Sequence, residues 1–139
     1  MQTQSIMVIG SDERRAQIRQ FCQRTDLVLI GEIAHSAGLP LIARACPDIV
    51  ILDSLTPTIN ILTILPWLCS LPEAPRVIAL GSHGSASERR LLLELGAITY
   101  AMLDAPGALA EALTLTSKLA HLAGQHPFRT TRPALGSSW

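Results

Sequence analysis

The sequence contains little charge, few aromatic side chains and almost no lysine. Of its 139 residues, 16% are charged and 4% are aromatic, and Lys118 is the only lysine. Basic and acidic residues balance to a formal net charge of zero. A chain without a basic excess has no general attraction for nucleic acid or for an anionic membrane surface. We therefore expect this domain to bind neither of them directly.

Cysteine is also scarce, and metal-binding patterns are missing. The three cysteines, Cys22, Cys46 and Cys69, are odd in number, far apart and set among apolar residues. This pattern favours small buried side chains in a reducing compartment over disulfide bonds or reactive thiols. None of the four histidines stands at a metal-ligand spacing from a cysteine or a carboxylate. We therefore expect no bound metal and no other cofactor.

Long apolar runs are missing as well, although 48% of the residues are hydrophobic. No run approaches the roughly 20 residues that a membrane-spanning helix needs, and the first residues lead into a strand-like segment rather than a signal peptide. We expect a cytoplasmic protein. Its 139 residues are enough for one domain with a core of Leu, Ile, Val and Ala.

Five short apolar runs have the length and composition of β-strands. They are rich in β-branched residues and mostly do not alternate with polar residues, which is typical of strands covered on both faces of a parallel sheet. The runs are SIMVI (5–9), LVLIGEI (27–33), DIVIL (48–52), RVIAL (76–80) and AITYAM (97–102).

The segments between these runs have the pattern of amphipathic helices. In the first, Ile18, Phe21 and Cys22 share one face, and Asp12 stands where an N-cap residue belongs. The expected helices are 12–24, 39–45, 60–71, 85–96 and 106–124.

Two of the expected helices carry signals for an interruption or an end. Pro66 removes a backbone donor inside 60–71, which predicts a kink or an early end near Leu65. In the next helix, Ser85 and Glu88 have the spacing of a capping box, and Gly96 is a stop signal.

Strand and helix alternate five times along the chain. This order predicts a doubly wound α/β fold with five parallel strands and helices on both faces of the sheet. We assign the domain to residues 1–123. From Gly124 the chain is rich in Pro, Gly, Ser and Thr without periodicity, so 124–139 is expected to be a flexible tail or a linker.

Asp53 is the candidate functional residue. In DIVILDSLTP (48–57), an apolar strand ends at Asp53, and Pro57 follows four residues later. Doubly wound sheets place their working sites at the carboxyl ends of the strands. An aspartate at a strand end also commonly accepts hydrogen bonds from backbone N–H groups of the following turn. From the residues alone, a working role and a structural role both stay open.

Over roughly residues 4–122, the chain resembles the receiver domain of bacterial two-component response regulators. DIVILDSLTP matches the strand and loop that carry the family's phospho-acceptor, here Asp53. GAITYAMLDAPGALAEAL (96–113) is similar to the last strand and helix of receivers that precede a helix-turn-helix domain in LuxR- and NarL-type transcription regulators, with Tyr100 at the aromatic switch position. The resemblance implies a flavodoxin-like, CheY-like sheet with strand order 2-1-3-4-5.

The resemblance also implies what should surround the acceptor. In the family, two acidic residues after the first strand help to bind Mg²⁺, a threonine or serine after the fourth strand contacts the phosphoryl group, and a lysine after the fifth strand pairs with it. Carried over, the acidic pair falls on Gly10 and Ser11, the hydroxyl residue on Gly81 and the lysine on Leu103.

Shifting the alignment by one residue does not restore this pocket. It would bring in Asp12, which fits better as a helix N-cap, or Ser82, which is the fairer candidate because a loop serine can reach the site. No shift supplies the lysine, because Lys118 lies in an expected helix. The resemblance therefore implies a degenerate pocket around Asp53.

Our first interpretation is a pseudo-receiver, which is a non-enzymatic module for signal transduction or transcription regulation. It would act through protein–protein contacts, independently of Mg²⁺-dependent phosphorylation. The alternative is a conventional receiver that binds Mg²⁺ as its cofactor and takes a phosphoryl group on Asp53 from a histidine kinase or a small phosphodonor. The expected partners are proteins: a kinase, an output domain or a second copy of the chain.

In the family, the face built from the fourth helix, fifth strand and fifth helix forms dimers or contacts the output domain. Here that face would include Arg89, Arg90, Leu93, Glu94 and Tyr100. The helix contains three consecutive leucines, which cannot all face the sheet. At least one of them is therefore expected at the surface or in an interface.

A third interpretation is a small flavodoxin-like enzyme or ligand carrier. The loop GSHGS (81–85) precedes a helix whose N-terminal N–H groups could hold an anion. The phosphate-binding patterns GxxxxGK[ST] and GxGxxG do not occur, and glycines before a capped helix usually form only a turn. We expect His83 to be an exposed loop residue rather than a catalytic base.

Overall fold

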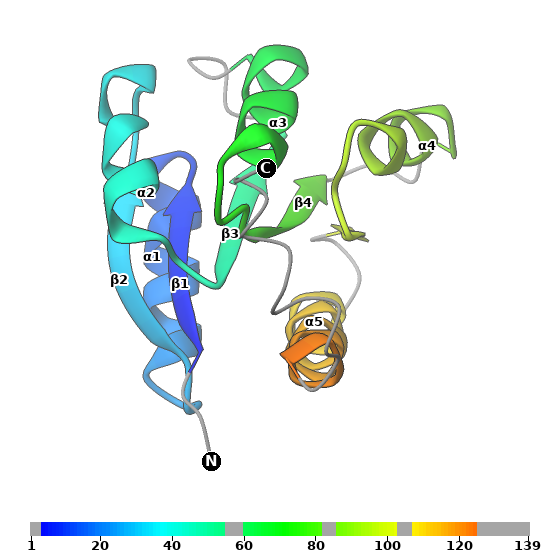
Figure 1. Ribbon diagram of the computed structural model, residues 1–139. Helices are drawn as coiled ribbons and strands as arrows, with labels where there is room; N and C mark the ends of the chain where they lie inside the picture. Colours follow the sequence, from blue (N-terminus) through cyan, green and yellow to red (C-terminus); the bar gives the residue numbers. More distant parts are fainter. Residues whose placement is uncertain (1–3, 55–59, 82–85, 103–106, 125–139) are drawn as a thin grey trace.

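The computed structural model describes residues 4–54, 60–81, 86–102 and 107–124, with side chains of the last helix described as far as Thr116 (Figure 1). Strands and helices alternate along the chain. In order they are β1 (Ser5–Ile9), α1 (Asp12–Cys22), β2 (Val28–Ile33), the 3₁₀ turn η1 (Ser36–Gly38), α2 (Pro40–Ala45), β3 (Ile49–Asp53), α3 (Ile61–Ser70), β4 (Arg76–Gly81), α4 (Ala86–Glu94), β5 (Thr99–Met102) and α5 (Ala108–Gly124).

The strands form one five-stranded parallel sheet in the order β2-β1-β3-β4-β5, which confirms the predicted fold. In a parallel sheet the carboxyl ends of all strands lie along one edge. Three positions of interest therefore come together there: Gly10 directly follows β1, Asp53 ends β3 and Gly81 ends β4. The pairing of Ile9 with Leu52 and of Asp53 with Leu80 fixes their mutual register.

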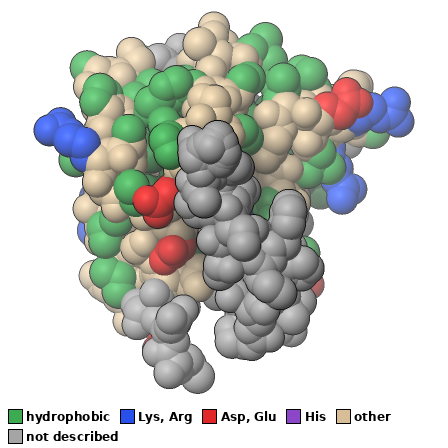
Figure 2. Space-filling model, viewed as in Figure 1, with side chains coloured by type: hydrophobic (Ala, Val, Ile, Leu, Met, Phe, Trp, Pro, Cys, Tyr) green, Lys and Arg blue, Asp and Glu red, His purple; other side chains and the backbone are tan. Residues whose placement is uncertain are grey.

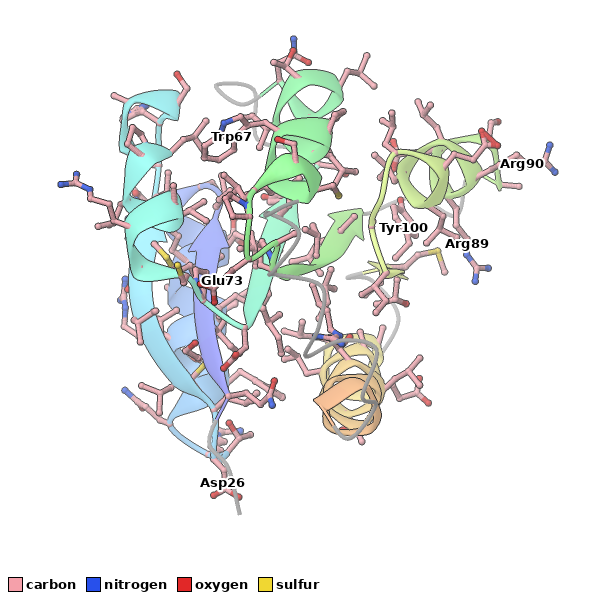
Figure 3. All side chains as sticks on the ribbon, in the orientation of Figure 1. Asp26, Trp67, Glu73, Arg89, Arg90 and Tyr100 are labelled. Atoms are coloured by element: carbon pink, nitrogen blue, oxygen red, sulfur yellow. The ribbon has the colours of Figure 1, made fainter. Side chains whose placement is uncertain are left out.

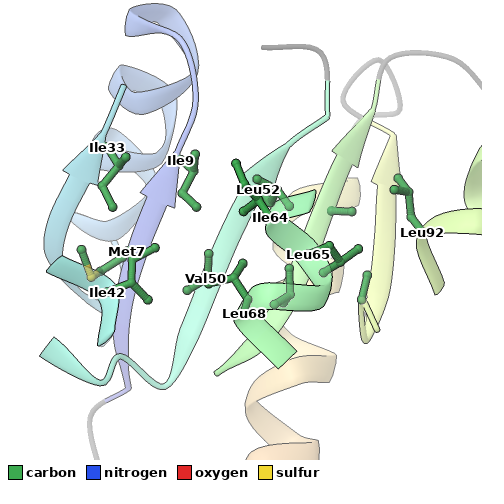
Figure 4. Close-up of a cluster of buried hydrophobic side chains, with 13 residues drawn as sticks. Met7, Ile9, Ile33, Ile42, Val50, Leu52, Ile64, Leu65, Leu68 and Leu92 are labelled. Atoms are coloured by element: carbon green, nitrogen blue, oxygen red, sulfur yellow. The ribbon is translucent and has the colours of Figure 1, made fainter. Parts of the chain in front are cut away.

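Helices cover both faces of the sheet, and each face has its own apolar core. Strand side chains alternate between the two cores because successive residues of a strand point to opposite faces. One core, drawn in Figure 4, lies under α2, α3 and α4 and consists of Met7, Ile9, Ile33, Ile42, Val50, Leu52, Ile64, Leu65, Leu68, Val77, Ala79, Leu92 and Ala97. The other lies under α1 and α5 and consists of Ile6, Val8, Ile18, Cys22, Ile49, Ile51, Ile78, Leu80, Ala101, Ala112 and Leu113.

The start of α1 differs from the sequence-based expectation. Ser11, not Asp12, is the N-cap residue, since its hydroxyl accepts a hydrogen bond from the backbone N–H of Arg14 at 3.3 Å. Asp12 is the first helical residue, where a carboxylate is favourable near the positive end of the helix dipole. The prediction of Asp12 as the N-cap is therefore wrong by one residue, because a serine caps a helix as well as an aspartate does.

Helix α3 continues through Pro66. Of the two outcomes predicted for this proline, a kink or an early end near Leu65, the early end is wrong. Pro66 lies on the exposed side of the helix, and its ring deprives the carbonyl of Leu62 of its usual donor. Leu62 is itself 55% exposed, so water can reach that end of the helix. Leu65 and Leu68 on the opposite side are fully buried, and their burial favours the continued helix.

The end of α4 shows why Gly96 is a glycine. Its φ is +123°, a conformation that side-chain-bearing residues rarely adopt. An added Cβ would also come within 2.3 Å of the Cys69 sulfur on α3. Gly96 therefore permits α4 to stop and lets β5 begin close to α3. The capping-box partner Ser85 lies outside the described residues.

Two expectations about burial are corrected. Strand β2 is an edge strand, and Val28 and Ile30 are 47% and 42% exposed rather than covered on both faces. Of the cysteines, Cys22 is buried, whereas Cys46 and Cys69 are exposed. Partial burial still raises the pKa of the Cys22 and Cys69 thiols, so both favour the protonated, unreactive form.

None of the described helices combines the length and the apolar character that crossing a membrane requires.

Candidate functional site

Asp53 lies at the carboxyl end of the most buried strand. Every residue of β3 is buried, and Asp53 itself is only 2% exposed. A carboxylate this far from water needs compensating charge or hydrogen bonds, because transfer of an ion out of water is unfavourable. The following residue, Ser54, extends the chain along β4 by hydrogen bonds from its backbone N–H and its hydroxyl to the Leu80 carbonyl, at 2.9 and 2.6 Å.

The compensating charge comes from Arg14 in the first turn of α1. Its Nε donates to Asp53 Oδ2 at 3.3 Å, and the two groups form a salt bridge in which the side chains are 17% and 3% exposed. A second guanidinium nitrogen, Nη1, donates to Gln17 Oε1 at 2.7 Å. The guanidinium is thus fixed by one contact within α1 and one contact across the sheet edge.

Gly10 provides the space that Arg14 occupies. A Cβ built at Gly10 would lie 3.1 Å from the Cβ of Asp53 and 3.3 Å from that of Arg14, which is tighter than most real contacts. A carboxylate at position 10 would therefore compete with the arginine for the same room. The missing side chain at Gly10 therefore leaves the room that the guanidinium of Arg14 occupies.

The neighbouring acidic residue does not join the pocket. The Asp12 side chain is 95% exposed and forms an ion pair with Arg15 on the surface of α1. Arg15 also donates to the Gly10 carbonyl at 3.2 Å, which ties the first turn of α1 to the end of β1. Ser11 is occupied as the N-cap, so it does not replace the missing carboxylate.

These donors do not fit a receiver-type Mg²⁺ site. Mg²⁺ prefers oxygen ligands with one or two carboxylates. In the part of the chain that the structure describes, Asp53 is paired with a guanidinium, Asp12 is exposed and paired with Arg15, and Glu88 near the end of β4 accepts a hydrogen bond from Tyr100. Within the same part of the chain, no three His, Cys, Asp or Glu side chains gather in a way that could hold a metal.

At the end of β4, Tyr100 fills the space beside Gly81. A Cβ built at Gly81 would lie 1.9 Å from the Tyr100 hydroxyl oxygen and 2.5 Å from Cζ, which no real structure allows. The Tyr100 hydroxyl donates to Glu88 Oε1 on α4 at 2.5 Å. The side chain therefore bridges β5, the end of β4 and the first turn of α4. Ser82 and Leu103, the other two pocket positions, lie outside the described residues, as do Pro57 and His83.

A groove of about 1340 Å³ runs between α4, β5 and α5. It contains all five residues expected on this face: Arg89, Arg90, Leu93, Glu94 and Tyr100. In Figure 3 the side chains of Arg89 and Arg90 extend away from the sheet, and Figure 2 shows basic and acidic side chains together at the α4 edge.

The leucines of α4 divide as expected between core and surface. Leu92 is 1% exposed, whereas Leu91 and Leu93 are 44% and 37% exposed. Leu115 of α5 adds a further apolar side chain to the groove and is 49% exposed. The groove thus combines an apolar floor with charged side chains, which is the usual composition of a protein-binding surface.

A charged cluster on the other side of the molecule supports α1. Arg19 makes two hydrogen bonds to the Glu32 carboxylate on β2, at 2.9 and 2.7 Å, and Arg15 approaches it to 3.6 Å. The hydrogen bond from Arg19 lowers the pKa of Glu32 below its usual value of 4.5, and the positive charges of Arg19 and Arg15 lower it further, while partial desolvation opposes the shift. The cluster links α1, which carries Arg14, to the edge strand.

Two residues of the site were not found from the sequence. Arg14 could have been suspected, since a basic residue in the first turn of a helix is unfavourable to the helix dipole unless it has an acidic partner. Glu88 was assigned to a capping box, and nothing in the sequence indicates its bond to a tyrosine 12 residues away. Both contacts depend on the relative positions of elements that are distant in sequence.

Comparison with known proteins supports the fold. No protein-family model matches the sequence, and no curated protein is significantly similar to it. Among solved structures, the receiver domain of NarL from Mycobacterium tuberculosis gives a TM-score of 0.73 at 20% identity, over 85% of this chain and 98% of that chain.

Two further solved structures have the same architecture. A LuxR-family response regulator from Aurantimonas sp. SI85-9A1 gives a TM-score of 0.73 at 20% identity, over 97% of this chain and 98% of that chain. The chemotaxis response regulator CheY4 of Vibrio cholerae gives 0.73 at 13% identity, over 83% and 99%. The chain therefore has the fold of response-regulator receiver domains.

Proposed function

We propose that this chain is a pseudo-receiver: a cytoplasmic signalling module that acts through protein–protein contacts and not through Mg²⁺-dependent phosphorylation of Asp53. The observation that carries this proposal is the Arg14–Asp53 ion pair. A phospho-acceptor must attack a phosphoryl donor whose oxygens are neutralised by a metal and a lysine. Here the carboxylate is already paired with an internal cation that enters from α1.

Three further features support the proposal. Gly10 and Ser11 provide no carboxylate for a metal, Gly81 has no hydroxyl to bind a phosphoryl group, and the chain's only lysine, Lys118, belongs to α5. In addition, Arg14 and Asp53 are both largely withdrawn from solvent. Mg²⁺ could bind Asp53 only if the Arg14 side chain, which Asp53 and Gln17 hold in place, first moved away.

The partner surface in this proposal is the groove between α4, β5 and α5. Its exposed leucines and its charges fit a protein partner rather than a small molecule or nucleic acid. The receivers that this chain resembles in fold belong to response regulators, including a LuxR-family one. A role in signal transduction or transcription regulation, with an output domain or a kinase as partner, follows as part of the proposal.

A second copy of the chain is the partner that we favour for this groove. Arg89 and Arg90 stand on α4, and Glu111 stands on α5 across the groove, with Glu94 at the end of α4. In a two-fold dimer, the basic side chains of one copy can meet Glu111 of the other, and the same contact occurs twice. The exposed apolar side chains of Leu93 and Leu115 would then be covered.

The experiment that tests the proposal uses a phosphodonor and a trapping anion. The protein is incubated with acetyl phosphate or with beryllofluoride, each with Mg²⁺, beside a conventional receiver as a positive control. Intact mass detects a covalent phosphoryl group. Fluorescence of Trp67 detects beryllofluoride, measured in a Trp139→Phe background because the chain has two tryptophans.

We expect no gain in mass and no saturable fluorescence change under conditions in which the control receiver is modified. A gain in mass or a saturable signal that disappears in Asp53→Asn would support the conventional receiver instead. A change that persists in Asp53→Asn would arise elsewhere on the chain and would leave the proposal intact.

A further inference from the structure

Gly81 and Tyr100 compete for one volume at the end of β4. The nearest atoms to a Cβ at position 81 are the Tyr100 hydroxyl oxygen at 1.9 Å, Tyr100 Cζ at 2.5 Å and Glu88 Oε1 at 3.0 Å. Since Cζ belongs to a rigid ring, rotation of the hydroxyl group does not relieve the overlap. Any side chain at position 81 would have to displace the whole ring or the strand.

Glu88 holds the ring in this position from the other side. It lies in the first turn of α4, is half-buried and accepts the hydrogen bond from the Tyr100 hydroxyl at 2.5 Å. A hydrogen bond to a carboxylate is stronger than one between neutral groups. Figure 3 shows Tyr100 between the sheet and α4, while Arg89 and Arg90 point away from the sheet.

The position of Tyr100 also determines the shape of the groove. Tyr100 and Met102 of β5 line it together with Arg89, Leu93 and Leu115 from the two flanking helices. The first turn of α4, which carries Glu88, leads directly into Arg89 and Arg90. A movement of the ring would therefore break the contact between β5 and α4 and change the floor of the groove at the same time.

We propose that Gly81 admits Tyr100 to the end of β4, and that the Tyr100–Glu88 hydrogen bond then holds α4 against β5 in one permanent arrangement. Tyr100 is thus a positioning residue for the protein-binding groove, and residue 81 decides whether it can take that position. The inference rests on the proposed function in one respect, because it takes the groove between α4, β5 and α5 as the protein-binding surface. The packing itself is independent of any partner.

The test uses the fact that Tyr100 is the only tyrosine of the chain. Protein labelled with 3-fluorotyrosine gives a single ¹⁹F resonance, whose difference in shift between H₂O and D₂O reports the solvent exposure of the ring. Amide hydrogen exchange of peptides from α4 reports how firmly this helix is held. Both are measured for the wild type and for Gly81→Ala, Glu88→Ala, Glu88→Gln and the control Arg24→Ala.

We expect Gly81→Ala to move the ¹⁹F resonance toward that of an exposed ring and to increase its solvent isotope shift. We expect Glu88→Ala to accelerate exchange of α4 by about tenfold or more, the effect of losing one net hydrogen bond to a charged group. Glu88→Gln keeps an acceptor oxygen and should lie between Glu88→Ala and the wild type. Arg24→Ala changes an exposed side chain beyond the end of α1 and should leave both signals unchanged.

Two results would overturn the inference. One is a ¹⁹F signal that stays at the wild-type position in folded Gly81→Ala, which would mean that the ring does not occupy this volume. The other is unchanged exchange of α4 in Glu88→Ala, which adds no volume and so tests the bond even if Gly81→Ala fails to fold. Neither readout involves a phosphodonor or self-association, so failure here is distinct from failure of the proposed function.

Discussion

The guanidinium of Arg14 lies 3.3 Å from the carboxylate of Asp53, at the carboxyl edge of the parallel sheet. The arginine comes from the first turn of α1, and the aspartate ends the central strand β3. Gly10 makes the approach possible because even a methyl group there would crowd both side chains. The carboxylate at the end of β3 is thus part of an internal ion pair.

The first prediction concerns the stability of this pair. Arg14→Ala leaves a carboxylate that is 2% exposed without its cation. Loss of one partner of a largely buried pair should lower the free energy of unfolding by about 1–3 kcal/mol. Urea unfolding followed by circular dichroism measures the change. The exposed Arg24→Ala, near the end of α1, should change it by less than about 0.5 kcal/mol.

A double-mutant cycle separates the pair from other effects of the arginine. In Arg14→Ala combined with Asp53→Asn, the loss should be smaller than the sum of the single losses, because the second change removes the charge that the first leaves unpaired. Additive losses would show that Arg14 stabilises the chain through Gln17 or through packing instead.

The second prediction restores metal binding. Ser11→Asp keeps an N-cap residue, Gly10→Asp supplies a second carboxylate, and Arg14→Ala removes the cation and vacates its volume. The triple variant should bind Mn²⁺ in the millimolar range or better, measured by water-proton relaxation. The wild type and Arg14→Ala alone should bind much more weakly. Equal binding by the wild type would contradict the conclusion that its donors do not fit a divalent cation.

The fold could be predicted from the sequence almost completely, while the site could be predicted only in part. Buried strands such as β3 and glycine stops such as Gly96 leave strong local signals, because period and backbone conformation are local properties. The extension of α3 past Pro66 could not be foreseen, since burial of Leu65 and Leu68 outweighs the local cost of proline.

The contacts of the site depend on three-dimensional placement. Asp53, Tyr100 and the two glycines could be identified by resemblance, but not which side chains fill the space beside Gly10 and Gly81. Arg14 enters from a helix, and Tyr100 enters from the neighbouring strand. A sequence shows that Gly10 and Gly81 lack side chains. It does not show which side chains from other helices or strands fill the space beside them.

The third prediction concerns pH. The Arg19–Glu32 interaction lowers the pKa of Glu32 in the folded state below its usual value of 4.5. The stabilisation is therefore fully present above about pH 4.5 and is lost as the pH falls through the lowered value. The free energy of unfolding is measured by chemical unfolding at neutral pH and again between about pH 3 and 4. It should fall less between the two conditions in Glu32→Gln than in the wild type.

The matched control for this measurement is Glu73→Gln, which changes an exposed carboxylate outside the cluster. In Glu73→Gln the free energy of unfolding should fall on acidification by as much as it does in the wild type. High salt should reduce the difference between Glu32→Gln and the wild type, since the pair is partly exposed and screening weakens it. A larger acid-induced loss in Glu32→Gln would be opposite in sign to this prediction.

The fourth prediction tests the self-complementary charges of the groove. Arg89→Glu combined with Arg90→Glu should weaken self-association at least about tenfold, because each new acidic side chain would meet Glu111 of the other copy. Adding Glu111→Arg should restore it. Sedimentation velocity over a concentration series measures the association. Arg24→Glu combined with Arg44→Glu changes two exposed arginines away from the groove and is the control for an equal change of net charge.

If the protein is monomeric at all concentrations tested, or if the control variant weakens association as much as the change at Arg89 and Arg90 does, the groove is not the dimer interface. In the monomeric case the groove remains available for a different protein. The phosphodonor experiment is unaffected by either result.

The last prediction concerns Pro66, the residue at which local cost and tertiary packing oppose each other. Pro66 lies inside α3 on its exposed side, so Pro66→Ala restores a backbone donor to the Leu62 carbonyl and removes the ring without loss of core contacts. It should raise the free energy of unfolding by about 1–3 kcal/mol.

Pro40 is the matched control, because it stands in the first turn of α2, where proline costs no hydrogen bond. Pro40→Ala should lower the stability by about 0.4–1 kcal/mol through the greater freedom of the unfolded chain. The two alanine substitutions are thus expected to have opposite signs in the same urea titration. Equal signs would mean that the ring of Pro66 stabilises α3 through its own contacts, and that the helix continues because of the proline and not in spite of it.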